Sequence, residues 1–144
     1  MLKPFLLIIF IPFISWTQSE LFIGQWTTHL PYNNGLQITQ SEDYIYYATA
    51  FSLLQIDKSD FSPKKITRTE GLSGSQINCI YFHQETKTLV IAYSDGLIDL
   101  VREEGVSAVP DIKIYNNVPI NKTIRSITGG DAQHVFINAD YGIS

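Results

Sequence analysis

Histidine and cysteine are the residues whose chemistry is most often used in catalysis and metal binding, and the sequence offers few of them. His29, His83 and His134 stand far apart, whereas a zinc site needs three or four converging ligands. We therefore expect each histidine to be a polar residue on the surface. Cys79 lies in the apolar run INCIYF with no plausible base beside it, so we expect a small buried side chain and not a nucleophile.

Aspartates and a glycine-rich segment are the other candidates for chemistry. Asp95, Asp99 and Asp140 lack the dense Asp/Gly spacing of a calcium-binding loop, and turn formation accounts for Asp95 and Asp140. The segment GLSGSQ (Gly71–Gln76) lacks the lysine and the strand-to-helix context of a phosphate loop, so it is expected to be a connecting turn. Because no G-x-S-x-G motif is present either, we predict a protein without enzymatic activity, metal or cofactor.

Trp26 and Tyr32 are the two candidate binding residues. They suit an exposed aromatic patch for a glycan or a protein partner, and they suit equally a core position that fixes the entry strand. Electrostatics offers no further site, since the formal net charge is −4 and the only basic cluster is Lys64 and Lys65 with Arg68. A solvated strand edge explains this cluster, and a nucleic-acid partner is not expected.

Residues 1–18 have the layout of a secretory signal peptide, with a lysine near the start and an apolar run that ends in small or polar residues. The run of about 12 residues is shorter than the roughly 20 that a membrane-spanning helix needs. We therefore predict an exported chain without a transmembrane anchor, and one domain in residues 19–144. A single cysteine allows no intrachain disulfide, so the fold depends on its packed core.

A strand-turn-strand unit repeats along residues 19–144. Three apolar strands can be laid over one another without gaps, and the residues after their turns then match at Leu53, Leu97 and Ile143. The three strands are Ile45–Ala48, Leu89–Ala92 and Val135–Asn138, and the strands expected before them are Gly35–Gln40, Gln76–Phe82 and Lys122–Thr128. Repeats of four strands at about 40–45 residues are typical of β-propeller blades.

Local patterns agree with an all-β propeller. Both alternating sets of side chains in LVIAY (Leu89–Tyr93) are apolar or small, which predicts burial on both faces of the strand. Asp95-Gly96 suits a two-residue turn in which both residues take positive φ. The segments SDFSP (Ser59–Pro63) and DIKIYNNVP (Asp111–Pro119) are expected to be outer strands and connections between blades.

Several segments also resemble a known family. The opening IGQWTTHLPYNNG, with its W-x-x-H-L-x-Y-N stretch, and the later YIYYAT, GLSGSQINCIYF, TKTLVIAYSDGLIDLV and INADYGIS resemble the amino-terminal propeller of PorZ-like proteins. These proteins belong to the type IX secretion system of Bacteroidetes bacteria. The strand-turn-strand units alone are similar to the propeller repeats in periplasmic sensor regions of hybrid two-component regulators.

The resemblance to PorZ-like proteins implies a non-enzymatic scaffold in the periplasm or at the outer cell surface. Its partners would be other proteins of the attachment complex, which processes sorting signals of cargo and anchors the cargo to anionic lipopolysaccharide. Lipopolysaccharide or another glycan would be a further ligand. The alternatives are a ligand-sensing propeller and, as a third hypothesis, a glycan-active enzyme. Because the third repeat stops within its third strand, we expect a truncated propeller of about three blades whose ring does not close.

Overall fold

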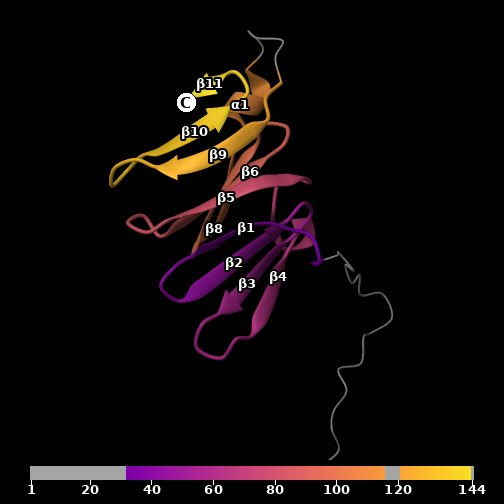
Figure 1. The fold of residues 1–144 in the computed structure, drawn as a ribbon, viewed down its shortest axis with the longest axis vertical. Coiled ribbons are helices and arrows are strands. Elements are labelled where there is room, and N and C mark those ends of the chain that lie inside the picture. Colours follow the sequence, from indigo (N-terminus) through magenta and orange to yellow (C-terminus); the bar gives the residue numbers. More distant parts are fainter. Residues whose placement is uncertain (1–31, 116–120, 144) are drawn as a thin grey trace, which may run out of the picture.

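The computed structural model describes residues 32–115 and 121–143, which form three stacked antiparallel sheets (Figure 1). Blade 1 contains β1 (Gly35–Gln40), β2 (Tyr44–Thr49), β3 (Leu53–Asp57) and β4 (Pro63–Ile66). Blade 2 contains β5 (Ile77–His83), β6 (Thr88–Tyr93), β7 (Ile98–Arg102) and β8 (Gly105–Val109). Blade 3 contains β9 (Ile124–Gly129), β10 (Val135–Ala139) and β11 (Gly142–Ile143). The strands of each sheet follow chain order, which confirms the predicted propeller architecture, and the described blades form an open arc.

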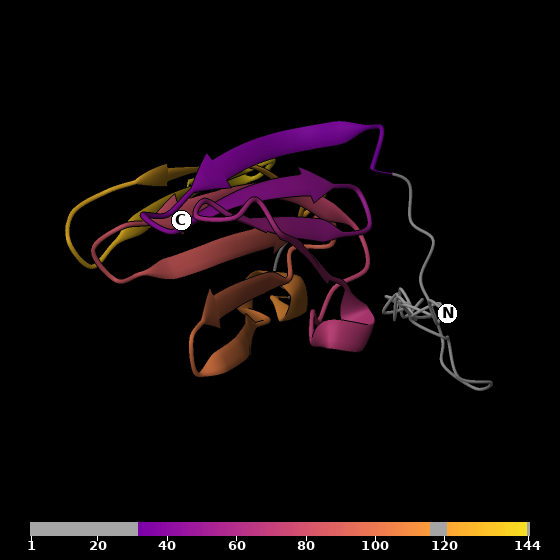
Figure 2. The ribbon, with the colours of Figure 1, turned by 90° about the horizontal axis from the view of Figure 1, so that it is seen from below.

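Two short helices lie in the connections between blades. The 3₁₀ turn η1 (Arg68–Glu70) follows blade 1, and α1 (Asp111–Ile114) follows blade 2. In Figure 2 both lie on the side of the molecule opposite β1. The outer strand of blade 2 is β8, so the described part of DIKIYNNVP begins with a helical turn in the connection and does not form a strand.

Strand β6 is the centre of the core. All six of its residues are buried, and its alternating side chains enter two separate clusters. Leu89, Ile91 and Tyr93 pack with blade 1, whereas Val90 and Ala92 pack with blade 3. The predicted burial of this strand on both faces is therefore confirmed, because a blade lies against each side of it.

Side chains of β1 also accept hydrogen bonds from backbone N–H groups of the neighbouring inner strand β5. Gln37 Oε1 accepts a hydrogen bond from the N–H of Ile80 (3.0 Å), and Thr39 Oγ1 accepts one from the N–H of Phe82 (3.2 Å). These donors have no partner strand on that side of β5, since β5 pairs only with β6. The contacts fix the separation and the register of blades 1 and 2 without a shared sheet.

The turn between β6 and β7 differs from the predicted two-residue turn. The N–H of Tyr93 donates to the carbonyl of Leu97 (2.9 Å), which encloses a three-residue loop. Within this loop only Gly96 takes a positive φ (85°), whereas Asp95 does not. The Asp95 carboxylate accepts the N–H of Leu97 instead (3.1 Å). Three-residue hairpin loops that end in a left-handed glycine are a common alternative to the two-residue type.

The longer loop shifts the correspondence between blades by one residue. Ala92 pairs with Ile98, whereas the equivalent Ala48 of blade 1 pairs with Leu53. In blade 3 Asn138 pairs with Ile143. Leu53 and Ile143 therefore correspond to Ile98, and the gapless match to Leu97 is wrong because blade 2 holds one extra residue in its turn.

Candidate binding groove

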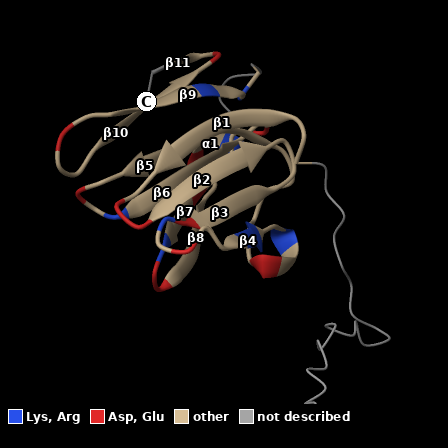
Figure 3. Cartoon of the chain, turned by 60° about the horizontal axis from the view of Figure 1, so that its bottom comes forward, with Lys and Arg blue, Asp and Glu red and all other residues tan. Residues whose placement is uncertain are grey.

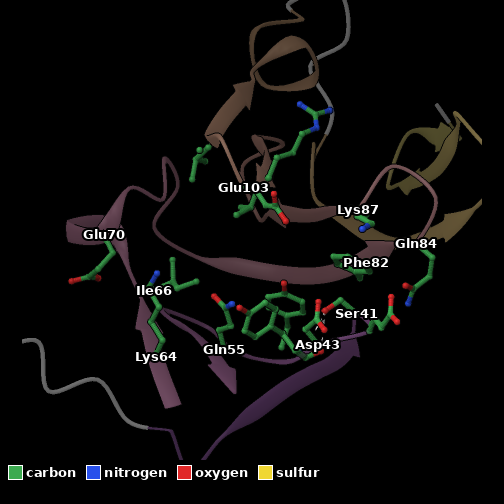
Figure 4. Close-up of a pocket in the computed structure, with 17 residues that line it drawn as sticks. Ser41, Asp43, Gln55, Lys64, Ile66, Glu70, Phe82, Gln84, Lys87 and Glu103 are labelled. Carbon is green, nitrogen blue, oxygen red and sulfur yellow. Dashed lines mark hydrogen bonds between the residues drawn. The ribbon is translucent and has the colours of Figure 1, made fainter. Parts of the chain in front are cut away.

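A groove of about 580 Å³ lies between blade 1 and blade 2. The hairpins β1–β2, β5–β6 and β7–β8 border it together with β4 and η1. Figure 4 shows side chains from both blades pointing into the space between them. The groove exists because the inner strands β1 and β5 are held together by hydrogen bonds, while the outer strands of the two blades diverge.

Aromatic rings form the deepest part of the groove. Tyr46 of β2 stacks on Phe82 of β5 with ring centroids 5.7 Å apart and an angle of 15° between the planes. Tyr44 lies on the same side of β2, two residues before Tyr46, and its ring is tilted by 52° at 6.3 Å. Burial raises the pKa of the Tyr46 phenol, so its hydroxyl stays neutral at physiological pH. Ile66, Val101 and Val106 complete this apolar floor.

Charged side chains of both signs occupy the lips of the groove. The acidic residues are Glu42, Asp43 and Glu103, and the basic residues are Lys64, Lys87 and Arg102. Within the described residues none of these six belongs to a salt bridge. Figure 3 shows where acidic and basic residues lie along the hairpin loops and connections. Arg102 is oriented by a bond from its Nε to Thr88 Oγ1 (3.0 Å).

Glu70 also lines the groove, but its carboxylate is already used. It accepts the backbone N–H of Thr67 (2.8 Å) and the hydroxyls of Thr67 and Thr69, which makes it the acidic partner of a capping box. The hydrogen bonds from Thr67, and then from Thr69, lower the pKa of Glu70. Glu70 therefore stabilises η1 at the end of the groove and is not available to a ligand.

The groove has the character of a binding site. In residues 32–115 and 121–143, no group of three or more His, Cys, Asp or Glu residues is arranged to hold a metal ion. The lining contains neither histidine nor cysteine. What it offers is an apolar floor with polar groups around it, which is the usual composition of a ligand site.

Of the two aromatic residues named from the sequence, Tyr32 does not line this groove. Trp26 lies outside the described residues. Tyr32 is half-buried at the entry to blade 1, where its carbonyl accepts the Tyr47 hydroxyl (2.9 Å) and Lys65 Nζ lies 5.5 Å from its ring centroid. A binding role for Trp26 and Tyr32 therefore stays a prediction.

All three histidines were predicted to lie on the surface, and the structure confirms this for His134 but not for His83. His29 lies outside the described residues, and His134 is exposed with its Nδ1 2.6 Å from Asp131 Oδ1. His83 was expected at the surface, but it is buried with 6% of its surface exposed. Its Nδ1 accepts from Thr86 Oγ1 (3.0 Å), so Nε2 carries the proton and donates to the Asp131 carbonyl (3.1 Å). His83 is buried because it bridges the first hairpin of blade 2 to that of blade 3.

The remaining polar predictions agree with the structure. Asp95 pairs with Lys113 (2.8 Å), and Asp140 pairs with Arg125 (2.5 Å), both at hairpin turns. Lys64 and Lys65 are exposed on the edge strand β4. Cys79 is buried, and its burial raises the thiol pKa to about 11. A thiol in that state is a packing residue and a poor nucleophile.

Asp99 is an acidic residue whose burial was not predicted from the sequence. It is fully buried, and its Oδ2 accepts the Tyr93 hydroxyl (2.6 Å) and the backbone N–H of Ser73 (2.8 Å). Its Oδ1 has no hydrogen-bond partner among the described residues. Asp99 thereby ties the connection from blade 1 to the core of blade 2. The signal was its position inside the apolar run LIDLV, where a charge needs a partner.

Comparisons with known proteins agree with this architecture. Residues 45–144 match the family model of the PorZ amino-terminal β-propeller domain of the type IX secretion system. A solved structure of PorZ from Porphyromonas gingivalis, a bacterial surface component essential to that system, superposes with a TM-score of 0.71 at 24% identity. The match covers 77% of this chain and 15% of that one. No curated protein sequence matches the chain. None of the helices in the described ranges could cross a membrane.

Proposed function

Because the chain belongs to the family of PorZ amino-terminal β-propeller domains, we propose that it is a non-enzymatic scaffold of the type IX secretion and attachment machinery. It acts outside the inner membrane, in the periplasm or on the cell surface, and residues 1–18 direct its export. Its partners are other proteins of the attachment complex. Together they remove the sorting signal from cargo and anchor the cargo to anionic lipopolysaccharide.

The observation that carries this proposal is the family match over residues 45–144. The groove supports a binding role in addition, because it joins an apolar floor to polar lips. A rigid propeller presents such surfaces at fixed positions, which suits a protein that brings others together. Fold alone does not decide between a scaffold and a sensor, since one fold hosts many activities.

Deletion of the gene in the bacterium that carries it tests the proposal. We expect cargo proteins to lose their attachment to the cell surface and to keep their sorting signal, as measured by immunoblots of surface fractions. The wild-type gene supplied in trans should restore both properties. Unchanged cargo attachment would refute the scaffold role. A downstream reading frame that encodes a membrane span and a kinase would assign the propeller to a sensor instead.

A further inference from the structure

The lining of the groove between blades 1 and 2 favours one class of ligand. We propose that it binds an extended peptide segment of a partner protein, with one apolar side chain flanked by charged residues of both signs. This inference rests on the proposed function as a protein-binding scaffold. Neither Trp26 nor Tyr32 is needed for it.

The floor of the groove selects an apolar side chain. Tyr46 and Phe82 are 9% and 8% exposed, and their ring faces stack on each other. They therefore present little open ring face on which a sugar could lie. Ile66, Val101 and Val106 offer no hydrogen-bond partners to hydroxyl groups. A sugar hydroxyl buried against these three side chains would lose its hydration without replacement, whereas an apolar side chain gains by leaving water.

The lips of the groove select charges of both signs. At the hairpin end, blade 1 presents Glu42 and Asp43, and blade 2 presents Lys87 and Arg102 together with Glu103. An anionic polymer would meet the two acidic residues of blade 1 at short range, and a polycation would meet the two basic residues of blade 2. A peptide that carries both lysine and glutamate can place each against the opposite sign.

Amide side chains next to the floor suit a peptide backbone. Gln55 lies on β3 and Gln84 on the β5–β6 hairpin, one on each blade. Gln84 donates through Nε2 to the carbonyl of Gln40 (2.9 Å), which directs the amide into a fixed orientation. An amide group can both donate and accept, as the N–H and C=O of an extended segment require. The groove volume of about 580 Å³ lies within the usual range for ligand sites, roughly 300–1,000 Å³.

Binding of short peptides to the full-length protein tests the proposal. The probes are fluorescein-labelled octapeptides with a central Phe flanked by both Lys and Glu, and matched peptides with a central Asp, with Lys flanks only or with Glu flanks only. Fluorescence anisotropy measures the affinity. We expect the Phe peptide with mixed flanks to bind at least about tenfold more tightly than the Asp peptide.

Two variants test whether the peptide binds in the groove. Val106→Trp fills the space above the floor and should weaken binding of the mixed-flank Phe peptide by about tenfold or more. Lys87→Glu should strengthen binding of the Lys-flanked peptide and weaken binding of the Glu-flanked peptide; the substitution keeps a side chain at a residue of φ 48°, so backbone strain is unchanged. Arg68→Glu is the matched control, because Arg68 is exposed on η1 and does not line the groove. Circular dichroism checks that all three variants keep their fold.

Three outcomes would overturn the proposal. The first is that no peptide binds at concentrations up to about 1 mM. The second is binding that Val106→Trp and Lys87→Glu leave unchanged. The third is displacement or saturation of the groove by maltohexaose or purified anionic lipopolysaccharide in a manner that Val106→Trp abolishes, because the groove would then be a glycan site. These measurements use purified protein, so they succeed or fail independently of the cargo phenotype that tests the scaffold role.

Discussion

The bond between Tyr93 and Asp99 gives the sharpest test of how the core of blade 2 is held together. Tyr93→Phe removes the hydroxyl that lies 2.6 Å from Asp99 Oδ2 and leaves the fully buried carboxylate with the Ser73 N–H as its remaining donor. A hydrogen bond to a charged group contributes about 1.5–3 kcal/mol. Since Asp99 Oδ1 has no partner among the described residues, we expect Tyr93→Phe to lower the free energy of unfolding by about 2 kcal/mol.

Asp99→Asn removes the charge of the carboxylate but keeps an oxygen that can accept both hydrogen bonds. The amide oxygen can still accept from Tyr93 and Ser73 while the buried charge is gone, but the NH2 group takes the place of the partnerless Oδ1. We therefore expect a loss of about 1–3 kcal/mol for the unsatisfied donors. In the Asp99→Asn background Tyr93→Phe should cost only about 0.5–1.5 kcal/mol, the value of a bond between neutral groups. The double-mutant cycle would then give a coupling energy of about 1 kcal/mol between the two sites.

Urea unfolding followed by circular dichroism measures these differences. Tyr81→Phe is the matched control, because the half-buried Tyr81 hydroxyl makes no hydrogen bond within the described part of the chain. The reasoning is refuted if Tyr93→Phe costs no more than Tyr81→Phe, or if Tyr93→Phe and Asp99→Asn are simply additive.

Three further outcomes are expected. The pKa of Glu70 is lowered in the folded protein, so its carboxylate stabilises the fold fully at pH values above the ordinary pKa of about 4.5. This contribution is lost as the pH falls through the lower pKa of the folded state. Glu70→Gln should therefore destabilise the protein at pH 7 and have less effect at pH 3 in urea titrations. The Cys79 thiol, with a pKa of about 11, should react with Ellman's reagent at pH 8 only after denaturant is added; rapid labelling of the native protein would contradict its burial. Gly74→Ala should destabilise by about 2 kcal/mol or more, since its Cβ would lie 2.3 Å from the Tyr93 ring, and an unchanged urea midpoint would show that the ring moves freely.

The periodic features of the fold could be predicted from the sequence. The repeat placed the central strands correctly because apolar runs and turn residues are local signals, and the two-sided burial of β6 follows from its composition. The register after the β6–β7 turn could not be predicted in the same way. Asp95-Gly96 suits loops of two or three residues, and only the pairing of Ala92 with Ile98 decides between them.

Features that depend on contact between blades were beyond the sequence reading. His83 lies at the end of β5, where a polar surface position is the usual expectation, and its burial results from the Asp131 carbonyl of the next blade. The groove combines hairpins and strands from two blades, so no single segment indicates it. Asp99 could be predicted only in part. Its apolar neighbours in the sequence indicate burial, but its hydrogen-bond partners Tyr93 and Ser73 come from other elements.

The sharing of β6 between two clusters has a consequence for how the array unfolds. In proteins built from repeats, stability is approximately a sum of the stability of each repeat and a coupling to its nearest neighbours. Blade 2 contributes to both couplings seen here, because Leu89 and Ile91 face blade 1 while Val90 and Ala92 face blade 3. Amide hydrogens of β6 should consequently exchange most slowly, and the edge strand β4 should open before β6.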